Sequence, residues 1–292
     1  MSNDKSDPDF ANFFSGSLPD VLYHYTSMEA LLSIVQSGRI WATDTRYLND
    51  RTDGTYLFEL LKTHIARRAN KATNQDRKDS ERLLWLLEIM PRYAVFVTSF
   101  SEVGDSLSQW RAYSPGGIGF SIGFNAKAIA QGRVDLSGDE PLPALVRLAR
   151  VRYLSEDADS NLDEILNFAE ILGGWVAKSD PPKDLIPSTA STLAVFAPIF
   201  KHNAFKEECE WRLILSGLPD SMPPKKFRAG RSMLVPYIEA EPKRNAGYFI
   251  REVIVGPTPH SEFSAEAVKA LFESINRPEV NVRISDVPYR HW

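Results

Sequence analysis

The sequence of 292 residues predicts an α+β fold in which one sheet collects strands that lie far apart along the chain. Runs such as 94–100, 210–215 and 251–256 are rich in β-branched and aromatic residues, which is typical of buried strands. Segments with helical periodicity fill much of the chain between these runs. Because no break in composition divides the chain, we expect a flexible polar tail at 1–20 and a single α+β domain at 21–292.

The expected elements follow one another without an internal repeat. A strand at 21–25 leads into a helix, which Thr26 and Glu29 are expected to start as a capping box and Gly38 to end. Further strands are expected at 40–44, 94–100, 117–124, 145–154, 210–215, 233–238, 251–256 and 280–285. Further helices are expected at 55–68, 78–90, 105–113, 161–178, 187–204 and 262–275. The proline-rich, basic stretch 218–232 is expected to form a long loop.

Composition excludes several classes of protein. The 34 Lys and Arg residues against 38 Asp and Glu residues give a net charge of −4, so no overall field attracts nucleic acid or an anionic membrane. The single cysteine, Cys209, excludes an intramolecular disulfide, as is usual in a reducing cytoplasm. The N-terminus lacks the apolar core of a signal peptide, and no apolar run is long enough to cross a bilayer. We therefore expect a soluble, cytoplasmic protein without a membrane partner.

Three clusters of polar residues lie on or beside predicted strands, where apolar side chains are the rule. The first cluster is His24–Tyr25, and the second is Ser99 and Ser101 at the end of the strand 94–100. The third is EECEWR, residues 207–212, at the start of a later strand. Polar groups at buried strand ends need hydrogen-bond partners or a functional role, so these clusters supply the candidate site residues.

The third cluster carries closely spaced carboxylates. Side chains alternate along a strand, so Glu208 and Glu210 are expected on one face and Cys209 on the opposite, buried face. Carboxylates that lie close together repel each other, which raises the pKa of one of them or suits the binding of ligand hydroxyl groups. In the structural alternative, Lys206 or Arg212 pairs with a glutamate, and the polar residues of the other clusters satisfy local hydrogen bonds.

Several segments together resemble an uncharacterised bacterial domain-of-unknown-function family. These segments are LYHYTS with IVQSG, LND, FVTSFSE, DSLSQWRAY followed by GIGFSIGF, FKEECEWRLI and VIVGP. They extend from about residue 21 to residue 257, which is most of the chain.

The order of the three clusters also resembles the ADP-ribosyltransferase superfamily, which has Arg or His on a first strand, a central Ser or Tyr element and a late catalytic Glu. The opening LYHYTSMEALLSIVQSG is similar to the first motif of the RNA 2′-phosphotransferases and of DNA-modifying toxins. The resemblance implies a split, antiparallel-rich sheet with helices packed around it. It also implies an enzyme that cleaves the nicotinamide–ribose bond of NAD, with a nucleic-acid, protein or water acceptor, as a toxin or phage-defence effector.

By this resemblance, the reaction passes through an oxocarbenium-like ribose, as glycoside cleavage does. Glu210 is expected to stabilise the positive charge, and Glu208 to orient or deprotonate the acceptor. We expect Glu210→Gln to abolish activity while leaving the fold intact. His24 is expected to hold the adenosine-side ribose, and no metal is expected. The further residues expected to bind NAD, by stacking on nicotinamide, positioning the ribose or meeting the pyrophosphate, are Tyr25, Thr26, Tyr47, Ser99, Ser101 and Arg212.

The basic stretch KKFRAGR offers a contact to a nucleic-acid or protein acceptor. Its cations suit phosphate groups and its aromatic ring suits a stacked base, while a solvated charged segment is the alternative. The residues concerned are Lys225, Lys226, Phe227, Arg228 and Arg231.

Two further hypotheses remain open. One is a non-catalytic module of a bacterial defence or stress system that senses a nucleotide or nucleic acid without turnover. The other is a metal-assisted nuclease with ligands from His24, His202, Glu208 and Glu210. The sequence contains no dinucleotide-binding fingerprint, P-loop, H-E-x-x-H or G-x-S-x-G motif, so no other familiar enzyme class is indicated.

Overall fold

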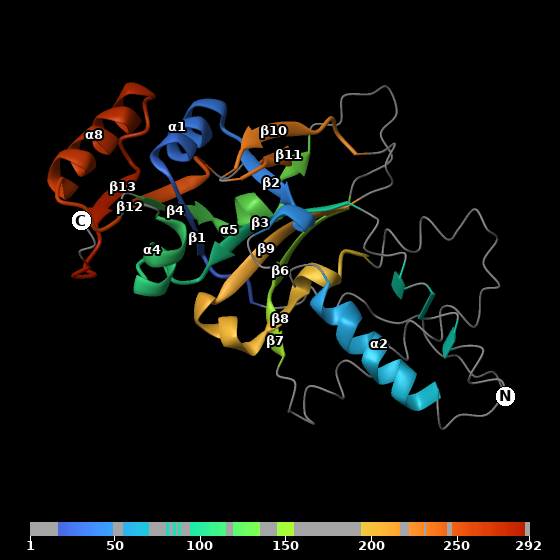
Figure 1. The fold of residues 1–292 in the computed structure, drawn as a ribbon. Coiled ribbons are helices and arrows are strands. Elements are labelled where there is room, and N and C mark those ends of the chain that lie inside the picture. Colours follow the sequence, from blue (N-terminus) through green and yellow to red (C-terminus); the bar gives the residue numbers. More distant parts are fainter. Residues whose placement is uncertain are drawn as a thin grey trace.

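The computed structural model describes residues 17–48, 55–69, 80–81, 84–85, 87–88, 94–114, 119–134, 145–154, 194–216, 222–230, 232–243 and 247–289. In this part of the chain, a sheet of 11 strands forms the centre of the molecule and helices cover both of its faces (Figure 1). Neighbouring strands of the sheet run antiparallel, except the last two, which run parallel. The predicted α+β class with an antiparallel-rich sheet is therefore confirmed.

The elements are as follows. The strands of the main sheet are β1 (Val21–Thr26), β2 (Ile40–Asp44), β3 (Val95–Ser101), β4 (Phe120–Asn125), β5 (Arg133–Val134), β6 (Leu145–Arg150), β9 (Glu210–Ser216), β10 (Lys226–Ala229), β11 (Leu234–Glu241), β12 (Ile250–Val255) and β13 (Asn281–Ile284). The short strands β7 (Arg152–Leu154) and β8 (Phe200–His202) pair separately. The helices are α1 (Met28–Ser37), α2 (Tyr56–Ala69), α4 (Leu107–Tyr113), α5 (Ala126–Ala130) and α8 (Ser261–Ser274), and the 3₁₀ turns are η2 (Thr45–Tyr47), η5 (Ala197–Ile199) and η6 (Asn203–Glu208).

Most of the predicted elements are present, and the differences have physical causes. The helix expected at 187–204 is wrong in its described part, because Pro198 lies in the 3₁₀ turn η5 and the chain then extends into β8. The loop expected at 218–232 contains β10, which is the edge strand of the sheet, where charged side chains are common. The run expected at 145–154 divides between β6 in the main sheet and β7 in the small one. The helix expected at 161–178 lies outside the described residues.

Helix α1 begins one residue later than the predicted capping box. Ser27, not Thr26, is the N-cap and accepts a hydrogen bond from the Ala30 N–H at 3.3 Å. Thr26 instead ends strand β1. Gly38 ends the helix as predicted, in the left-handed conformation (φ 67°) that glycine adopts at low cost.

Residues before β1 already contact the sheet. Leu18 packs against the main core, and the Ala126 N–H donates to the Asp20 carbonyl at 3.2 Å. Residues 1–16 lie outside the described part, so the flexible tail expected at 1–20 stays a prediction. That residues 21–292 form a single domain stays a prediction.

Strand β3 is the branch point of the sheet. One edge of β3 pairs along its whole length with β9. The other edge pairs with β2 at Phe96 and Val97 and with β1 at Ser101, so β1 and β2 diverge and split the sheet as predicted. In the gap between them, the Thr98 hydroxyl donates to the Trp41 carbonyl at 3.0 Å, and a side chain thus completes the hydrogen bonding of the backbone.

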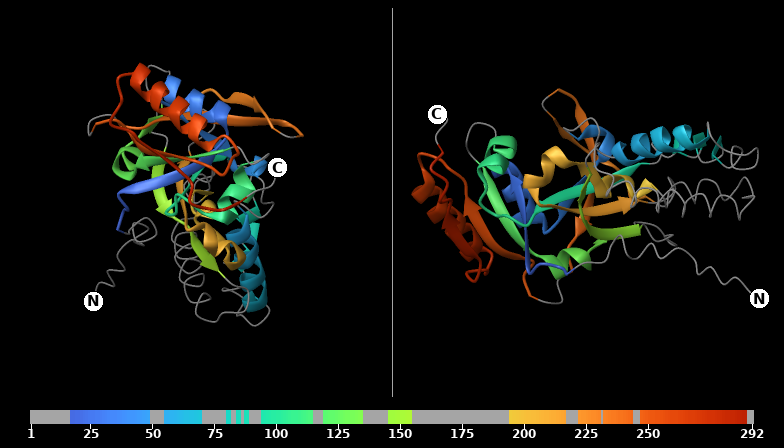
Figure 2. Two further views of the ribbon diagram at one scale, coloured as in Figure 1. Left: turned by 90° about the vertical axis from the view of Figure 1, so that its left-hand side faces the viewer. Right: turned by 90° about the horizontal axis from the view of Figure 1, so that it is seen from below.

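The two faces of the sheet carry different helices. Helices α1 and α8 lie side by side on one face (Figures 1 and 2), and together with α5 they enclose a large apolar core. Helices α2 and α4 pack against the opposite face, α2 together with β8 and η5. The face that carries α4 is the one that holds the candidate site.

Helix α4 is fixed to the rest of the molecule through Trp110 and Asp105. The Trp110 side chain is 1% exposed and meets the ring of Tyr25 edge-on, with 4.7 Å between ring centroids. The Trp110 Nε1–H donates to Asp105 Oδ1 at 2.7 Å. The same carboxylate accepts from the Ser285 hydroxyl at 2.5 Å and from the Asp286 N–H at 2.8 Å. Asp105 thereby ties the start of α4 to the segment that follows β13.

Replacing Asp105 with Asn should lower the free energy of unfolding by about 1.5–3 kcal/mol, because bonds to a charged acceptor are strong and an amide nitrogen cannot accept. Urea unfolding followed by tryptophan fluorescence measures the change. Asp286→Asn is the matched control, since it removes the same charge from an exposed neighbour and should leave the midpoint almost unchanged. Equal midpoints for the two variants would show that Asp105 does not anchor α4.

Candidate active site

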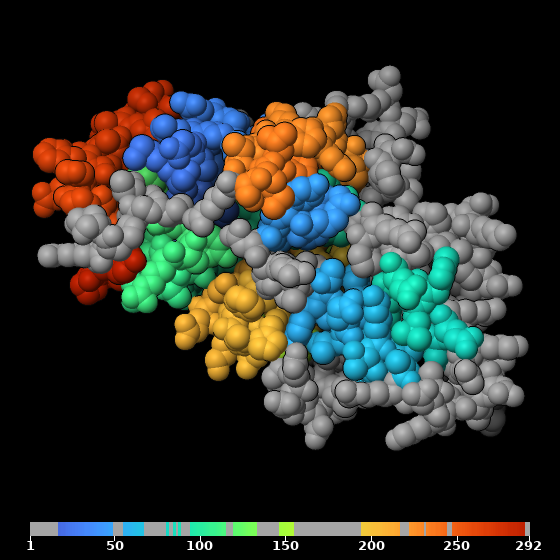
Figure 3. Space-filling model, viewed as in Figure 1, coloured from blue at the N-terminus to red at the C-terminus, as the bar shows by residue number. Residues whose placement is uncertain are grey.

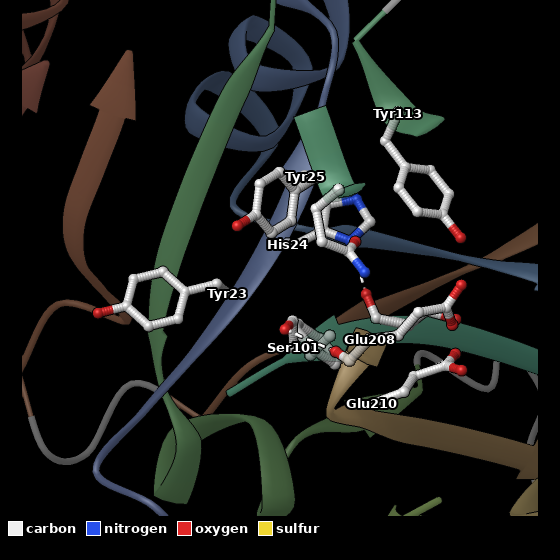
Figure 4. A pocket seen from close by; sticks show the side chains of 10 residues that line it. Tyr23, His24, Tyr25, Ser101, Tyr113, Glu208 and Glu210 are labelled. Carbon is white, nitrogen blue, oxygen red and sulfur yellow. Dashed lines mark hydrogen bonds between the residues drawn. The ribbon is translucent and has the colours of Figure 1, made fainter. Parts of the chain in front are cut away.

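The three polar clusters, which are far apart in the sequence, meet at one small cavity (Figure 4). Its walls come from β1, β3, α4, η6 and β9, and its volume is about 60 Å³. Ligand pockets usually measure about 300–1,000 Å³, so this cavity holds a small part of a nucleotide at most. The residues that line it are Tyr23, His24, Tyr25, Ser99, Phe100, Ser101, Gln109, Tyr113, Glu208 and Glu210.

A cluster of four charged side chains lies beside the cavity. Arg212 is 1% exposed and holds Glu210 with two hydrogen bonds, from Nε at 2.7 Å and from Nη2 at 3.0 Å. The buried Lys201 Nζ lies 3.1 Å from a carboxylate oxygen of Glu210 and 2.6 Å from one of Glu208. Two carboxylates and two cations balance each other, and this balance allows ionised groups to remain buried.

The two carboxylates differ in their capacity to meet a ligand. Glu210 accepts two bonds from Arg212, one from Lys201 and one from the Ser99 hydroxyl. A carboxylate offers about four acceptor positions, and these contacts occupy them. Glu208 is held by Lys201 through Oε2, and its side chain is 18% exposed, against 5% for Glu210. Of the two carboxylates, Glu208 is therefore better placed to accept a hydrogen bond from a ligand.

The same contacts move the pKa values of the two carboxyls apart. Burial by itself raises the pKa of Glu210, but the charges of Arg212 and Lys201 outweigh burial and lower it to about 2. Burial is also the largest influence on Glu208 and raises its pKa, and the Lys201 charge opposes this rise without reversing it. The neighbouring Glu210 charge raises the pKa of Glu208 further. Glu210 thus stays ionised, whereas Glu208 is suited to exchange a proton.

Strand alternation does not bring Glu208 and Glu210 together, which corrects the prediction. Glu208 ends the 3₁₀ turn η6, and Cys209 turns the chain in the left-handed conformation (φ 44°) before Glu210 begins β9. Cys209 is partly exposed rather than buried. The turn places Glu208 beside Lys201, so both carboxylates approach one ammonium group. A non-glycine residue with positive φ is strained, and such residues cluster at functional sites.

The two serines support the carboxylates from the neighbouring strand. Ser101 is the ladder partner of Glu210, and Ser99 is the ladder partner of Arg212. Ladder partners share a face, so these four side chains point to the same side of the sheet. The Ser101 hydroxyl also donates to the Glu208 carbonyl at 2.7 Å, which fixes the backbone that carries this carboxylate.

His24 fills the gap where β1 leaves β3. Its Nδ1 lies 2.8 Å from the Ser99 carbonyl, and because a carbonyl can only accept, Nδ1 carries the proton. Burial lowers the pKa of His24, the bond to Ser99 opposes this change, and the charge of Arg228 lowers the pKa further. The ring is therefore neutral, and its Nε2 is a hydrogen-bond acceptor in a residue that lines the cavity.

Hydrogen bonds within the protein hold Tyr25 and Arg212, which were both expected to contact NAD. The Tyr25 hydroxyl donates to the Val103 carbonyl at 2.8 Å and accepts from the Ser106 N–H at 3.0 Å. The Arg212 guanidinium donates to the Pro198 carbonyl at 3.0 Å in addition to its bonds with the carboxylate. Tyr25 nevertheless lines the cavity, whereas Arg212 is 1% exposed, and contact of either side chain with NAD stays a prediction.

Thr26 and Tyr47 lie outside the cavity wall formed by the described residues. Thr26 is the last residue of β1 and is 8% exposed, and Tyr47 belongs to the turn η2 after β2. This geometry does not support the contacts with NAD that were expected of them.

The basic stretch expected to meet an acceptor lies on the edge strand β10. Phe227 is 62% exposed, and the Lys225 ammonium lies 5.8 Å from the centroid of the Phe96 ring. Lys226 is paired with a glutamate of β11. Arg231 lies outside the described residues. Contact of this stretch with a nucleic acid or a protein stays a prediction.

Lys201, Gln109 and Tyr113 are site residues that the sequence did not assign. The segment that contains Lys201 was expected to be helical, and the pairing of β7 with β8 brings it to the carboxylates. Gln109 and Tyr113 lie one helical turn apart on α4, which places both on its cavity side. Burial raises the pKa of Tyr113 to about 12, so its hydroxyl stays protonated beside the glutamates (Figure 4).

Fold and site together define an α+β protein with a split sheet and a buried carboxylate pair at a small cavity. The model of a family described as Protein of unknown function (DUF2971) matches residues 109–213. This segment contains Glu208 and Glu210 but neither His24 nor Ser99. The predicted resemblance to a domain-of-unknown-function family is thereby confirmed for this segment. No curated protein and no solved structure matches the chain.

Neither a metal centre nor a membrane span is found in the part of the chain that the structure describes. No group of three or more His, Cys, Asp or Glu side chains there is arranged to hold a metal ion. His202, one of the candidate ligands, accepts from the Ala204 N–H at 3.1 Å and caps η6. No helix among the same residues is long and apolar enough to cross a membrane.

Removing one member of the charge cluster should destabilise the protein more than removing a matched pair. Arg212→Met and Glu210→Gln each remove one charge and leave the other three unbalanced, and each should lower the free energy of unfolding by about 3–5 kcal/mol. The double variant should lose much less than the sum, which a double-mutant cycle from urea unfolding measures. Additive losses would contradict the coupling. The sequence alone predicted that Glu210→Gln leaves the fold intact, whereas these contacts predict that it destabilises the fold.

The lowered pKa of Glu210 predicts a pH dependence of stability. A carboxyl with a lower pKa in the folded state stabilises the fold above its unfolded value, and this contribution is lost as pH falls towards the folded value. Between the ordinary pKa of 4.5 and about 2, the wild type should therefore lose stability more steeply than the double variant Glu210→Gln/Arg212→Met. Glu208 has the opposite effect because its pKa is raised: its contribution to stability is lost as the pH rises above 4.5. Urea unfolding at stepped pH measures both, and parallel curves below pH 4.5 would contradict the role of Glu210.

Proposed function

We propose that this protein is an ADP-ribosyltransferase-like enzyme that cleaves the nicotinamide–ribose bond of NAD and transfers ADP-ribose to an acceptor or to water. The observation that carries the proposal is the meeting of His24, Ser99 and the two glutamates at one cavity. They come from the first strand, from a central strand, and from the late turn η6 with the strand β9 that follows it, and this order agrees with the superfamily resemblance. The divergence of β1 and β2 along β3 also supports the proposal.

In this proposal, Glu208 rather than Glu210 is the carboxylate that meets the ribose. The acceptor positions of Glu210 are occupied by its partners within the protein. Glu208 is more exposed, and its pKa is raised, which suits proton exchange during the reaction. Glu210 is then a positioning residue, which holds Lys201 and through it Glu208.

The proposed reaction breaks the bond between C1′ of the ribose and the ring nitrogen of nicotinamide. The bonding electrons leave with nicotinamide and neutralise its ring, and the positive charge that develops on the ribose is stabilised by the ionised Glu208. An oxygen or nitrogen atom of the acceptor then bonds to C1′ and gives its proton to Glu208. His24 Nε2 accepts a hydrogen bond from a ribose hydroxyl, and Gln109 and Tyr113 offer donors at the wall.

A non-catalytic module that binds a nucleotide is the second candidate. The cavity volume of about 60 Å³ favours this second candidate, because the cavity would contact one end of a bound nucleotide without enclosing the rest. The saturated contacts of Glu210 favour it as well, since buried charge networks also serve purely structural roles. This candidate predicts binding of NAD or ADP-ribose without release of nicotinamide.

Nicotinamide release from NAD by the purified protein, with and without cell lysate as a source of acceptors, tests the proposal. The wild type should release nicotinamide, and Glu208→Gln should lower the rate by about 10²–10⁴-fold, as is typical when one such group is lost. Because Glu208 must be ionised, the rate should rise with pH through its raised pKa, and this dependence should vanish in the variant. Glu207→Gln is the matched control, since it changes an exposed neighbour on the same turn and should leave the rate unchanged.

The possible outcomes separate the candidates. Release that depends on lysate indicates a macromolecular acceptor, and release without lysate indicates hydrolysis of NAD. A rise in melting temperature with NAD, but no release in any condition, supports the binding module and overturns the enzyme. Absence of both release and thermal shift overturns both candidates.

A further inference from the structure

Arg228 is a partly buried cation without a carboxylate partner among the described residues. It lies on the edge strand β10, and its Nη2 is 3.4 Å from the Thr43 hydroxyl oxygen. Nearby cations are paired, since Lys226 and Arg39 each lie 2.9 Å from the carboxylate of Glu239. Arg228 therefore differs from the charged side chains around it.

A bound anion would pair with the partly buried charge of Arg228. Burial lowers the pKa of Arg228, because water is partly removed from its guanidinium group. Partly buried charges are normally paired, and a planar guanidinium group with several donors binds phosphate oxygens well. Arg228 is thus suited to form an ion pair with an anionic ligand.

The sheet register relates Arg228 to the cavity. Its side chain crosses β11 to reach Thr43 on β2, and Thr43 is the ladder partner of Val97 on β3. Val97 lies two residues before Ser99, so these side chains point to the same face of the sheet. As a diagonal neighbour, Thr43 lies about 7–8 Å from Ser99. The charge of Arg228 also acts on His24, at the cavity wall.

We propose that Arg228, oriented by its contact with Thr43, forms an anion subsite that holds the diphosphate of a nucleotide whose ribose end occupies the cavity. This inference rests on the proposed function, because NAD is such a nucleotide. The cavity of about 60 Å³ takes the reacting end alone, and the diphosphate is joined to the ribose through one methylene carbon, so it must bind close by. Arg212, which was expected to take this role, is 1% exposed.

The edge of the sheet that carries Arg228 lies at the surface. Figure 3 shows the β10–β11 hairpin (orange) at the surface beside β2 (blue), on the side of the molecule from which Figure 1 is drawn. A nucleotide that extends from the cavity towards this edge would pass the side of β2 that carries Thr43, which is 7% exposed, before it reaches β10.

Calorimetric binding of ADP-ribose, which carries the diphosphate but no nicotinamide, tests the subsite. Arg228→Gln should weaken binding about 10- to 100-fold, as expected for the loss of a charge-assisted hydrogen bond. Lys226→Gln is the matched control, because it removes a cation from the same strand and the same face, and it should change the affinity less than about twofold. In the turnover assay, KM for NAD should rise in Arg228→Gln by the same factor, while kcat changes less.

Stability is the second measurement on the same variant. Because Arg228 has no carboxylate partner in the described part of the chain, Arg228→Gln should keep or raise the melting temperature. A melting temperature that falls by several degrees would identify a structural role and overturn the subsite.

Failure of the subsite and failure of the proposed function give different results. Suppose that ADP-ribose binds to the wild type and not to Arg228→Gln, and that neither protein releases nicotinamide from NAD. The subsite is then supported, and the proposed enzymatic activity is overturned. If Arg228→Gln turns over NAD with an unchanged KM, the enzyme stands and the subsite does not. If the wild type binds neither ADP-ribose nor NAD, both are overturned.

Discussion

The candidate site depends on the charge balance of two carboxylates and two cations that are largely withdrawn from water. Each ion alone would cost several kcal/mol to bury, so the four groups must be present together. The strand pairing of β7 with β8 supplies Lys201, and β9 supplies Glu210 and Arg212. The turn η6 supplies Glu208. The position of Glu208 at the cavity is therefore a consequence of the whole fold and not of a local motif.

The branching of the sheet at β3 explains why polar side chains gather at this place. Where β1 and β2 separate, backbone carbonyls lose their neighbouring strand, and side chains must supply the missing hydrogen bonds. Thr98 and His24 do so, through the carbonyls of Trp41 and Ser99. Because His24 Nδ1 donates its proton to the Ser99 carbonyl, Nε2 carries no proton and can accept a hydrogen bond. The structural and the functional explanations of this histidine are thus compatible, although the sequence offered them as alternatives.

Periodicity and β-propensity predicted the strands β1, β3, β9 and β12 and the helices α1 and α8, because each has a strong local pattern. The position of Lys201 was not predictable in the same way, because it depends on a parallel pairing of short strands and on the break at Pro198. The approach of Glu208 to Glu210 depends on a left-handed Cys209, which no residue preference indicates. The sequence predicts a loop where strand β10 forms, because a charged edge strand has the same composition as a solvated segment.

A small cavity within the sheet structure is consistent with a reaction at a single bond. Electrostatic stabilisation is strongest where water is excluded, so enclosure matters for the bond that breaks and for the carboxylate that faces it. The remaining parts of a nucleotide must be bound but need not be enclosed. A guanidinium group at the edge of the sheet can bind a phosphate group through charge-assisted hydrogen bonds without a deep pocket. Glu208 and Arg228 stand at the two ends of such an arrangement, one lining the cavity and the other on the edge strand of the same face. If both ends act on one ligand, the distance between them selects for a diphosphate attached to a ribose, since a free ribose or a free phosphate reaches only one of them.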